Sequence, residues 1–246
     1  MDNQNTLSEI EILKNQLQKA QLPANLHDKA VQQIERINLS LKYGGNLSQL
    51  DITAKYIDWI CNLPWEIKTE DNLDIQHAKL LLDKNHYGLG QIKKRILEYL
   101  SLLIMQKKGG LIGVQHAPSL FFVGLVGTGK TTLAISIAEA LGRKFVRIPF
   151  GGLSSALDLR GQSKTSPEAE PGIIMKSLRR VGSKNPVILL DELDRITPES
   201  RASIMGVLIE LLDTEQNNNF NDYFIDYPFD LSKVLFVATA NNTNHI

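Results

Sequence analysis

The sequence has few of the features that mark secreted or membrane proteins. It contains one cysteine, Cys61, among 246 residues, so no disulfide can form within the chain and a reducing compartment is expected. It has no apolar run of about 18 residues, the length that a membrane-spanning helix needs. The N-terminal stretch MDNQNTLSEIEI lacks the basic and apolar regions of a secretory signal. We therefore predict a bacterial cytoplasmic protein that does not bind a membrane.

The chain also lacks an excess of charge of either sign. It has 27 basic and 27 acidic residues, whereas nucleic-acid-binding proteins usually carry more Lys and Arg than acids. The charges are unevenly distributed, because residues 143–184 contain nine Lys or Arg and three acids, and residues 191–230 contain ten acids and two Arg. Solvated helix faces beside an acidic active-site edge explain this as well as a partner-binding surface does. We expect no nucleic-acid partner.

Residues 6–66 have the periodicity of helices. Apolar residues recur every three or four positions in three stripes, which are broken at Pro23 and at the pair Gly44 and Gly45 and span residues 7–17, 26–41 and 50–61. Cys61 ends the third stripe, so we expect it to be a small buried hydrophobe. An all-helical arm of antiparallel helices is predicted over residues 1–66.

From residue 67 the pattern changes to alternating helices and short apolar runs. Helices are predicted at 74–84, 89–107, 130–141, 173–181 and 198–213, and strands at 119–124, 144–150, 186–192 and 233–241. This alternation is typical of a parallel sheet with helices on both faces. We therefore predict an α/β fold: a P-loop nucleotide-binding core over residues 67–246, preceded by the all-α arm.

The strongest signal is GLVGTGKT, residues 124–131, which fits G-x-x-x-x-G-K-[ST] between a predicted strand and a predicted helix. Glycines let the backbone turn its N–H groups onto phosphate oxygens, and the helix adds its positive N-terminal end. Lys130 is expected to reach the β- and γ-phosphates of ATP, and Thr131 to bind Mg²⁺. A glycine-rich turn without a ligand is the weaker alternative. The predicted nucleotide-binding residues here are Gly124, Val126, Gly127, Thr128, Gly129, Lys130, Thr131 and Thr132.

The second signal is VILLDELD, residues 187–194, a buried strand that ends in acids. Open α/β sheets bind their ligands at this end of the strands. Asp191 is expected to hold Mg²⁺ directly or through water, and Glu192 to orient and deprotonate the attacking water. Taken alone, a strand that ends in solvated acids is common.

A third strand, VLFVATAN, ends at Asn241. The amide of Asn241 has two equally good interpretations: it contacts the γ-phosphate or the attacking water, or it simply ends the strand as a turn residue.

The P-loop, the paired acids and the strand-terminal Asn resemble the layout of AAA+ ATPases. The stretches between them resemble Lon proteases from about residue 8 to the end of the chain: YIDWICNLPW, LDKNHYGLGQIKKRILEYL, ALGRKFVRIPFGGL, LRGQSKT, EPGIIMKSLRR, KNPVILLDELDR, LDTEQNNNF and PFDLSKVLFVATAN. The resemblance implies hexameric rings that bind ATP between subunits, unfold protein substrates and pass them to a Ser–Lys protease chamber. It also implies that Tyr87 lies against the adenine, although the residues alone favour a core or hinge position.

Two departures from the family pattern affect what is expected. An arginine finger, a helical lid and a protease domain should follow Ile246, so no Ser–Lys dyad is assigned, and we interpret the chain as a fragment or one part of a split protein with weak hydrolysis of its own. Where Lon proteins carry an aromatic–aliphatic pair in the pore, this chain has Ser166 and Pro167, and a second pore position is Ser200. Small polar residues grip a polypeptide poorly, unless a shifted alignment places Pro167 or Ile173 in the pore.

Three functions from different classes are therefore compared. The leading hypothesis is the ATP-binding and ATP-hydrolysing module of a Lon-type protease. The alternative is a non-proteolytic AAA+ nucleotide-binding module with a regulatory or remodelling role. A nucleic-acid motor on the same core is supported only by the basic stretch at 143–184.

Overall fold

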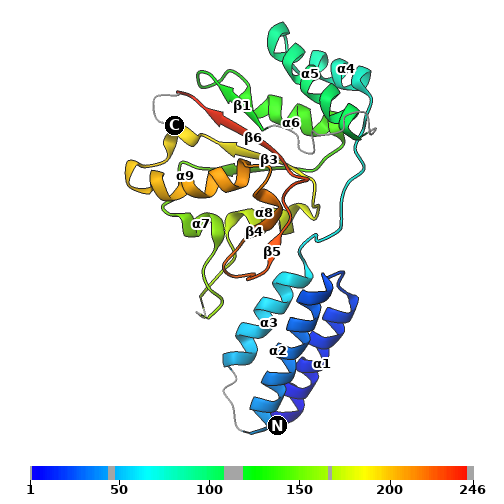
Figure 1. Ribbon diagram of the computed structural model, residues 1–246, viewed down its shortest axis with the longest axis vertical. Helices are drawn as coiled ribbons and strands as arrows, with labels where there is room; N and C mark the ends of the chain where they lie inside the picture. Colours follow the sequence, from blue (N-terminus) through cyan, green and yellow to red (C-terminus); the bar gives the residue numbers. More distant parts are fainter. Residues whose placement is uncertain (1, 44–47, 108–118, 166–167, 243–246) are drawn as a thin grey trace.

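The computed structural model describes residues 2–43, 48–107, 119–165 and 168–242. Three helices begin the chain and pack side by side as a bundle (Figure 1): α1 Asp2–Lys19, α2 Ala24–Lys42 and α3 Ser48–Cys61. Pro23 directly precedes α2. The predicted apolar stripes are the faces that meet inside the bundle, as Leu17, Ile34 and Ile57 show by being buried. Cys61 is half-buried, so it is less enclosed than expected.

Four parallel strands form the central sheet in the order β1-β6-β3-β2. They are β1 Leu120–Val123, β2 Phe145–Pro149, β3 Val187–Asp191 and β6 Leu235–Ala240. Each lies inside a predicted strand. All residues of β3 and β6 are buried, which explains why these strands are continuous apolar runs rather than alternating ones.

Helices cover both faces of the sheet (Figure 1), which confirms the predicted α/β fold. The side chains of Val187 and Leu189 pack with α4 Ile75–Asn85, α5 Gly90–Lys107 and α6 Lys130–Leu141. Ile188 and Leu190 point to the other face, which is covered by α7 Ala156–Arg160, α8 Ile173–Val181 and α9 Pro198–Leu212. In the described part of the chain, no helix is long and apolar enough to cross a membrane.

Several short elements follow α9 or β3: the 3₁₀ turns η1 Leu193–Arg195 and η2 Asn217–Asn219, and an antiparallel hairpin of β4 Phe220–Asn221 and β5 Pro228–Phe229. The turn of this hairpin is held by the buried carboxylate of Asp222, which accepts hydrogen bonds from the backbone N–H groups of Phe224 and Ile225. Burial raises the pKa of Asp222 to about 6.

The arm packs against this hairpin through α3. The Tyr56 hydroxyl donates a hydrogen bond to the carbonyl of Ile225 (3.2 Å), and the Tyr56 ring lies 6.2 Å from that of Phe224. The centre of the Trp65 ring lies 5.8 Å from that of the Tyr227 ring and 5.0 Å from that of the Phe229 ring. The buried residues of the arm and of the α7–α9 face therefore form one continuous hydrophobic cluster.

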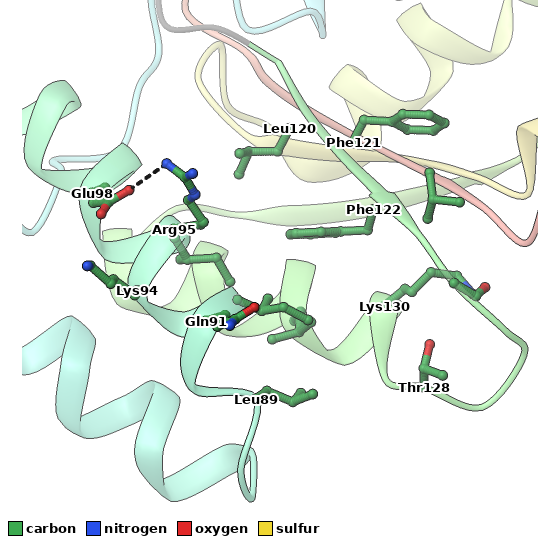
Figure 2. A pocket seen from close by; sticks show the side chains of 15 residues that line it. Leu89, Gln91, Lys94, Arg95, Glu98, Leu120, Phe121, Phe122, Thr128 and Lys130 are labelled. Carbon is green, nitrogen blue, oxygen red and sulfur yellow. Dashed lines mark hydrogen bonds and ion pairs between the residues drawn. The ribbon is translucent and has the colours of Figure 1, made fainter. Parts of the chain in front are cut away.

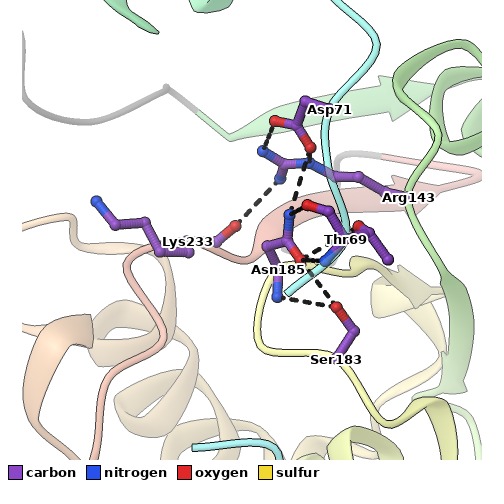
Figure 3. Close-up of polar contacts among 6 residues, drawn as sticks. All are labelled: Thr69, Asp71, Arg143, Ser183, Asn185 and Lys233. Atoms are coloured by element: carbon purple, nitrogen blue, oxygen red, sulfur yellow. Dashed lines mark hydrogen bonds and ion pairs between the residues drawn. The ribbon is translucent and has the colours of Figure 1, made fainter. Parts of the chain in front are cut away.

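The segment between Cys61 and α4 is fastened across one end of the sheet (Figure 3). The side-chain amide of Asn185 accepts from the N–H of Thr69 (2.8 Å) and donates to its carbonyl (2.9 Å). The Arg143 guanidinium donates two hydrogen bonds to the Asp71 carboxylate (2.8 and 2.7 Å) and a third to the carbonyl of Lys233 (3.1 Å). This polar network joins the segment to the residues that precede β2, β3 and β6.

The uneven charge along the chain is largely balanced inside the molecule. Seven of the nine basic residues at 143–184 form ion pairs within the described residues, four of them with acids from 191–230: Arg143–Asp71, Arg147–Asp191, Arg160–Glu210, Lys164–Asp226, Lys176–Glu170, Arg179–Asp58, and Lys184 with Glu66 and Asp230. The basic stretch therefore needs no external partner to explain it.

Candidate nucleotide-binding site

The glycine-rich loop connects the end of β1 to the start of α6, as predicted. Gly127 and Gly129 adopt left-handed backbone conformations, with φ of 82° and 84°, which side-chain-bearing residues rarely adopt. The N–H of Gly124 donates to the carbonyl of Ala240 (3.2 Å), which ties the loop to β6. Val126 is exposed at the tip of the loop. The loop therefore has the open, glycine-dependent backbone that a phosphate cradle requires.

Lys130 is the first residue of α6, and its ammonium group lies across the mouth of the loop. It donates to the carbonyls of Gly124 (2.5 Å) and Leu125 (2.9 Å) and to Oδ1 of Asn241 (2.9 Å). The fold thus brings Lys130 and Asn241, 111 residues apart, into direct contact. All three of these hydrogen-bond acceptors are oxygen atoms, the kind of partner that a phosphate would also offer to the ammonium.

Three threonines follow or interrupt the loop. The hydroxyl of Thr128 donates to the carbonyl of Leu125 (2.8 Å), and that of Thr132 donates to the carbonyl of Gly129 (2.8 Å). These two hydroxyls therefore brace the loop. Thr131 is half-buried in the first turn of α6, directly after Lys130.

Asp191 and Glu192 stand at the carboxyl end of β3, and one buried hydroxyl aligns them. The Thr239 hydroxyl donates a short hydrogen bond to Oδ1 of Asp191 and accepts one from the N–H of Glu192 (3.0 Å). Oδ2 of Asp191 accepts a hydrogen bond from Nε of Arg147 (2.5 Å). The sequence analysis does not single out Thr239, because its role depends on β6 lying beside β3.

Glu192 has a left-handed backbone conformation, with φ of 60°, and such a conformation costs a non-glycine residue roughly 1–2 kcal/mol. The turn ends β3 abruptly at the expected catalytic acid. The Glu192 carboxylate forms an ion pair with Arg195 (3.3 Å). Backbone strain of this kind is often concentrated at functional sites.

Asn241 is oriented by a second acid that sequence reasoning did not single out. Asp194 accepts from the N–H of Asn241 (3.0 Å) and from its side-chain Nδ2 (3.3 Å). With Nδ2 held by Asp194, Oδ1 of the amide faces Lys130. The side chain is therefore fixed in the site rather than free at a strand end.

A pocket of about 1100 Å³ adjoins the loop, between α5 and β1 (Figure 2). Leu89, Leu120 and Phe122 contribute apolar side chains, and Lys130 and Thr128 lie at one end. Lys94, Arg95 and Glu98 of α5 lie on the side away from Lys130. An apolar hollow next to a phosphate cradle suits a ligand with a flat ring and a charged tail.

The segment before α5 was expected to contact adenine through Tyr87. In the structure the Tyr87 side chain is fully exposed, which excludes a core position, and it does not line the pocket, whereas Leu89 does. The neighbouring His86 is buried, and its Nε2 lies 3.0 Å from the Ser136 hydroxyl on α6. Burial, with a smaller effect of Lys93, lowers the pKa of His86. The role of Tyr87 stays a prediction.

The three residues expected at pore positions are Ser166, Pro167 and Ser200. Ser166 and Pro167 lie outside the described residues. Ser200 was expected to face a pore, but it is buried, and its hydroxyl donates to the carbonyl of Ser154 (2.5 Å). That expectation for Ser200 is wrong for this fold, because the side chain fastens the start of α9 to the segment before α7.

Residues 120–246 match the ATPase family associated with various cellular activities (AAA). The match covers more than half of the chain, so the chain belongs to this AAA family. Its closely similar relatives include the Lon protease of Heliobacterium modesticaldum, which is 43% identical over 239 residues, and that of Dictyoglomus thermophilum, which is 46% identical over 233 residues. Lon protease 2 of Thermus thermophilus is 41% identical over 245 residues.

These alignments include 97%, 95% and 97% of this chain, respectively, but only 28%, 28% and 30% of the relatives. The resemblance to Lon proteases is therefore confirmed for nearly the whole chain. The chain spans less than a third of the length of the curated relatives it matches.

Proposed function

We propose that this site binds Mg·ATP and hydrolyses it. The observation that supports this best is the convergence of Lys130, Asn241, Asp191 and Glu192 at the carboxyl edge of the sheet, beside the glycine loop. The backbone N–H groups of the loop and the Lys130 ammonium would hold the phosphates. Thr131 and Asp191 would hold Mg²⁺, which neutralises phosphate charge when it is bound.

The remaining groups position the attacking water. Glu192 acts as the base that takes its proton, and Asn241 orients the water or the γ-phosphate through its amide. Thr239 keeps Asp191 and Glu192 in register, and Asp194 keeps the Asn241 amide in one orientation. Tyr87 would close over the adenine from the exposed turn before α5.

We propose further that the chain is the ATPase part of a Lon-type serine protease, with residues 1–66 as a helical arm and residues 67–246 as the nucleotide-binding core. Such a protein would work in the cytoplasm as a hexameric ring that unfolds and degrades proteins. The length and identity of the similarity to Lon proteases support this proposal. The internal pairing of the basic stretch gives no support to a nucleic-acid motor.

The test is a comparison of nucleotide binding and phosphate release in wild type and Glu192→Gln. The amide cannot accept the proton, so we expect hydrolysis to fall by about 10² or more, while binding of a fluorescent ATP analogue is retained. Glu199→Gln is the matched control, because Glu199 is exposed in the first turn of α9. Unchanged phosphate release in Glu192→Gln would reject Glu192 as the base.

A further inference from the structure

Asp191 is a buried acid paired with a half-exposed cation, Arg147. Its side chain is 5% exposed, whereas that of Arg147 is 49% exposed, and Nε of Arg147 lies 2.5 Å from Oδ2 of Asp191. A buried carboxylate needs a compensating charge or several hydrogen bonds. Arg147 supplies that charge from the neighbouring strand, β2, which pairs with β3.

The two oxygens of Asp191 have partners of different kinds. Oδ1 accepts from Thr239, which is fully buried on β6 and has no room to leave. Oδ2 accepts from the long Arg147 side chain, which is half-exposed and borders solvent. The nearby Lys130 does not share this task, because its ammonium is held by two carbonyls and Asn241. Oδ2 is therefore the oxygen that an incoming cation would reach by replacing a partner.

We propose that Arg147 is the resident counter-ion of Asp191, which Mg²⁺ displaces when it arrives with the nucleotide. Arg147 would then raise the Mg²⁺ concentration at which nucleotide binding is half-saturated. The inference rests on the proposed function, since it takes Asp191 as the residue that holds the metal. The two cations compete because both would use Oδ2 of Asp191. A guanidinium is weakly hydrated and loses little by binding a carboxylate. Mg²⁺ gives up its water reluctantly, so Arg147 is a real competitor for this position.

Removing Arg147 is expected to strengthen Mg²⁺ binding but to weaken the metal-free protein. Without Arg147, Asp191 is open to metal, so the Mg²⁺ concentration that half-saturates nucleotide binding falls. The expected decrease is about fivefold, the factor that corresponds to an ion pair with one exposed partner. In the absence of metal, the same variant leaves a buried carboxylate without its counter-charge, and its thermal unfolding midpoint falls.

The experiment uses Arg147→Gln, with Arg147→Lys as the variant that keeps the charge. Arg180→Gln is the matched control, because Arg180 is an exposed arginine on α8. A fluorescent ADP analogue is held at fixed concentration while Mg²⁺ is titrated, and thermal unfolding is followed separately in EDTA. We expect a lower Mg²⁺ midpoint and lower metal-free stability in Arg147→Gln, with both values near wild type in the other two variants.

An unchanged or higher Mg²⁺ midpoint in Arg147→Gln would overturn the proposal, because Arg147 would then hold Asp191 in place for the metal or have no influence on it. If Arg147→Gln does not fold, the test uses Arg147→Lys instead. A Mg²⁺ midpoint that is severalfold higher in Arg147→Lys than in wild type would also count against competition. Failure of the proposed function gives a different result: wild type would not bind the analogue, or would bind it without any Mg²⁺ dependence, and both ideas would fall together.

Discussion

The Thr239 hydroxyl connects the two acids of the site, Asp191 and Glu192. It is completely buried between Asp191 and the backbone of Glu192. Thr239→Val keeps the shape of the side chain but leaves a carboxylate oxygen and an N–H without this partner. We expect the free energy of unfolding in urea to fall by about 1–3 kcal/mol.

Thr239→Ser is the matched control, because it retains the hydroxyl and loses only a methyl group. It should stay closer to wild type in stability and should keep nucleotide binding. If Thr239→Val is as stable as wild type, the hydroxyl does not have the structural role assigned to it.

At the scale of elements, a buried ion pair between Arg143 and Asp71 is one of the contacts that fasten the segment between α3 and α4. The side chains of Arg143 and Asp71 are 8% and 2% exposed. Arg143→Gln removes the buried guanidinium that is bonded to both oxygens of Asp71, so we expect the free energy of unfolding to fall by about 3 kcal/mol. Urea denaturation measures this loss.

Arg95→Gln provides the comparison, because the Arg95–Glu98 pair joins two side chains that are 85% and 46% exposed (Figure 2). Exposed pairs contribute little, so this variant should unfold almost as wild type does. Equal losses in the two variants would mean that burial does not determine the strength of these pairs.

Elements with a long, regular pattern could be predicted from the sequence, and short ones could not. The strand β3 is a continuous apolar run that ends in acids. The P-loop motif predicts both the glycine-rich turn and the helix α6 that follows it. By contrast, the two-residue strands β4 and β5 have no period to detect. Thr239 and Asp194 act only because β6 lies next to β3, a neighbour relation that no local pattern contains.

On the scale of the whole molecule, the arm and the sheet share one hydrophobic cluster. The two tryptophans of the chain, Trp59 and Trp65, both lie at this junction, where they contact Phe224 and Phe229. We therefore expect tryptophan fluorescence and far-UV circular dichroism to report one coincident unfolding transition.

Phe224→Ala removes a buried ring from this junction, at an expected loss of about 3–5 kcal/mol. It should make the fluorescence transition precede that of the circular dichroism. Two separate transitions in the wild type would show instead that the arm and the core are energetically independent.

The central claim is that the loop at residues 124–132 holds nucleotide phosphates through Lys130. Its most direct test is titration of the purified chain with a fluorescent ATP analogue in Mg²⁺, beside Lys130→Ala and Lys144→Ala. Lys144 is an exposed lysine near the start of β2 and serves as the matched control. Saturable binding by wild type and Lys144→Ala, with loss of binding in Lys130→Ala, is the predicted result. Equal binding by all three proteins, or none by wild type, would contradict the assignment of this site.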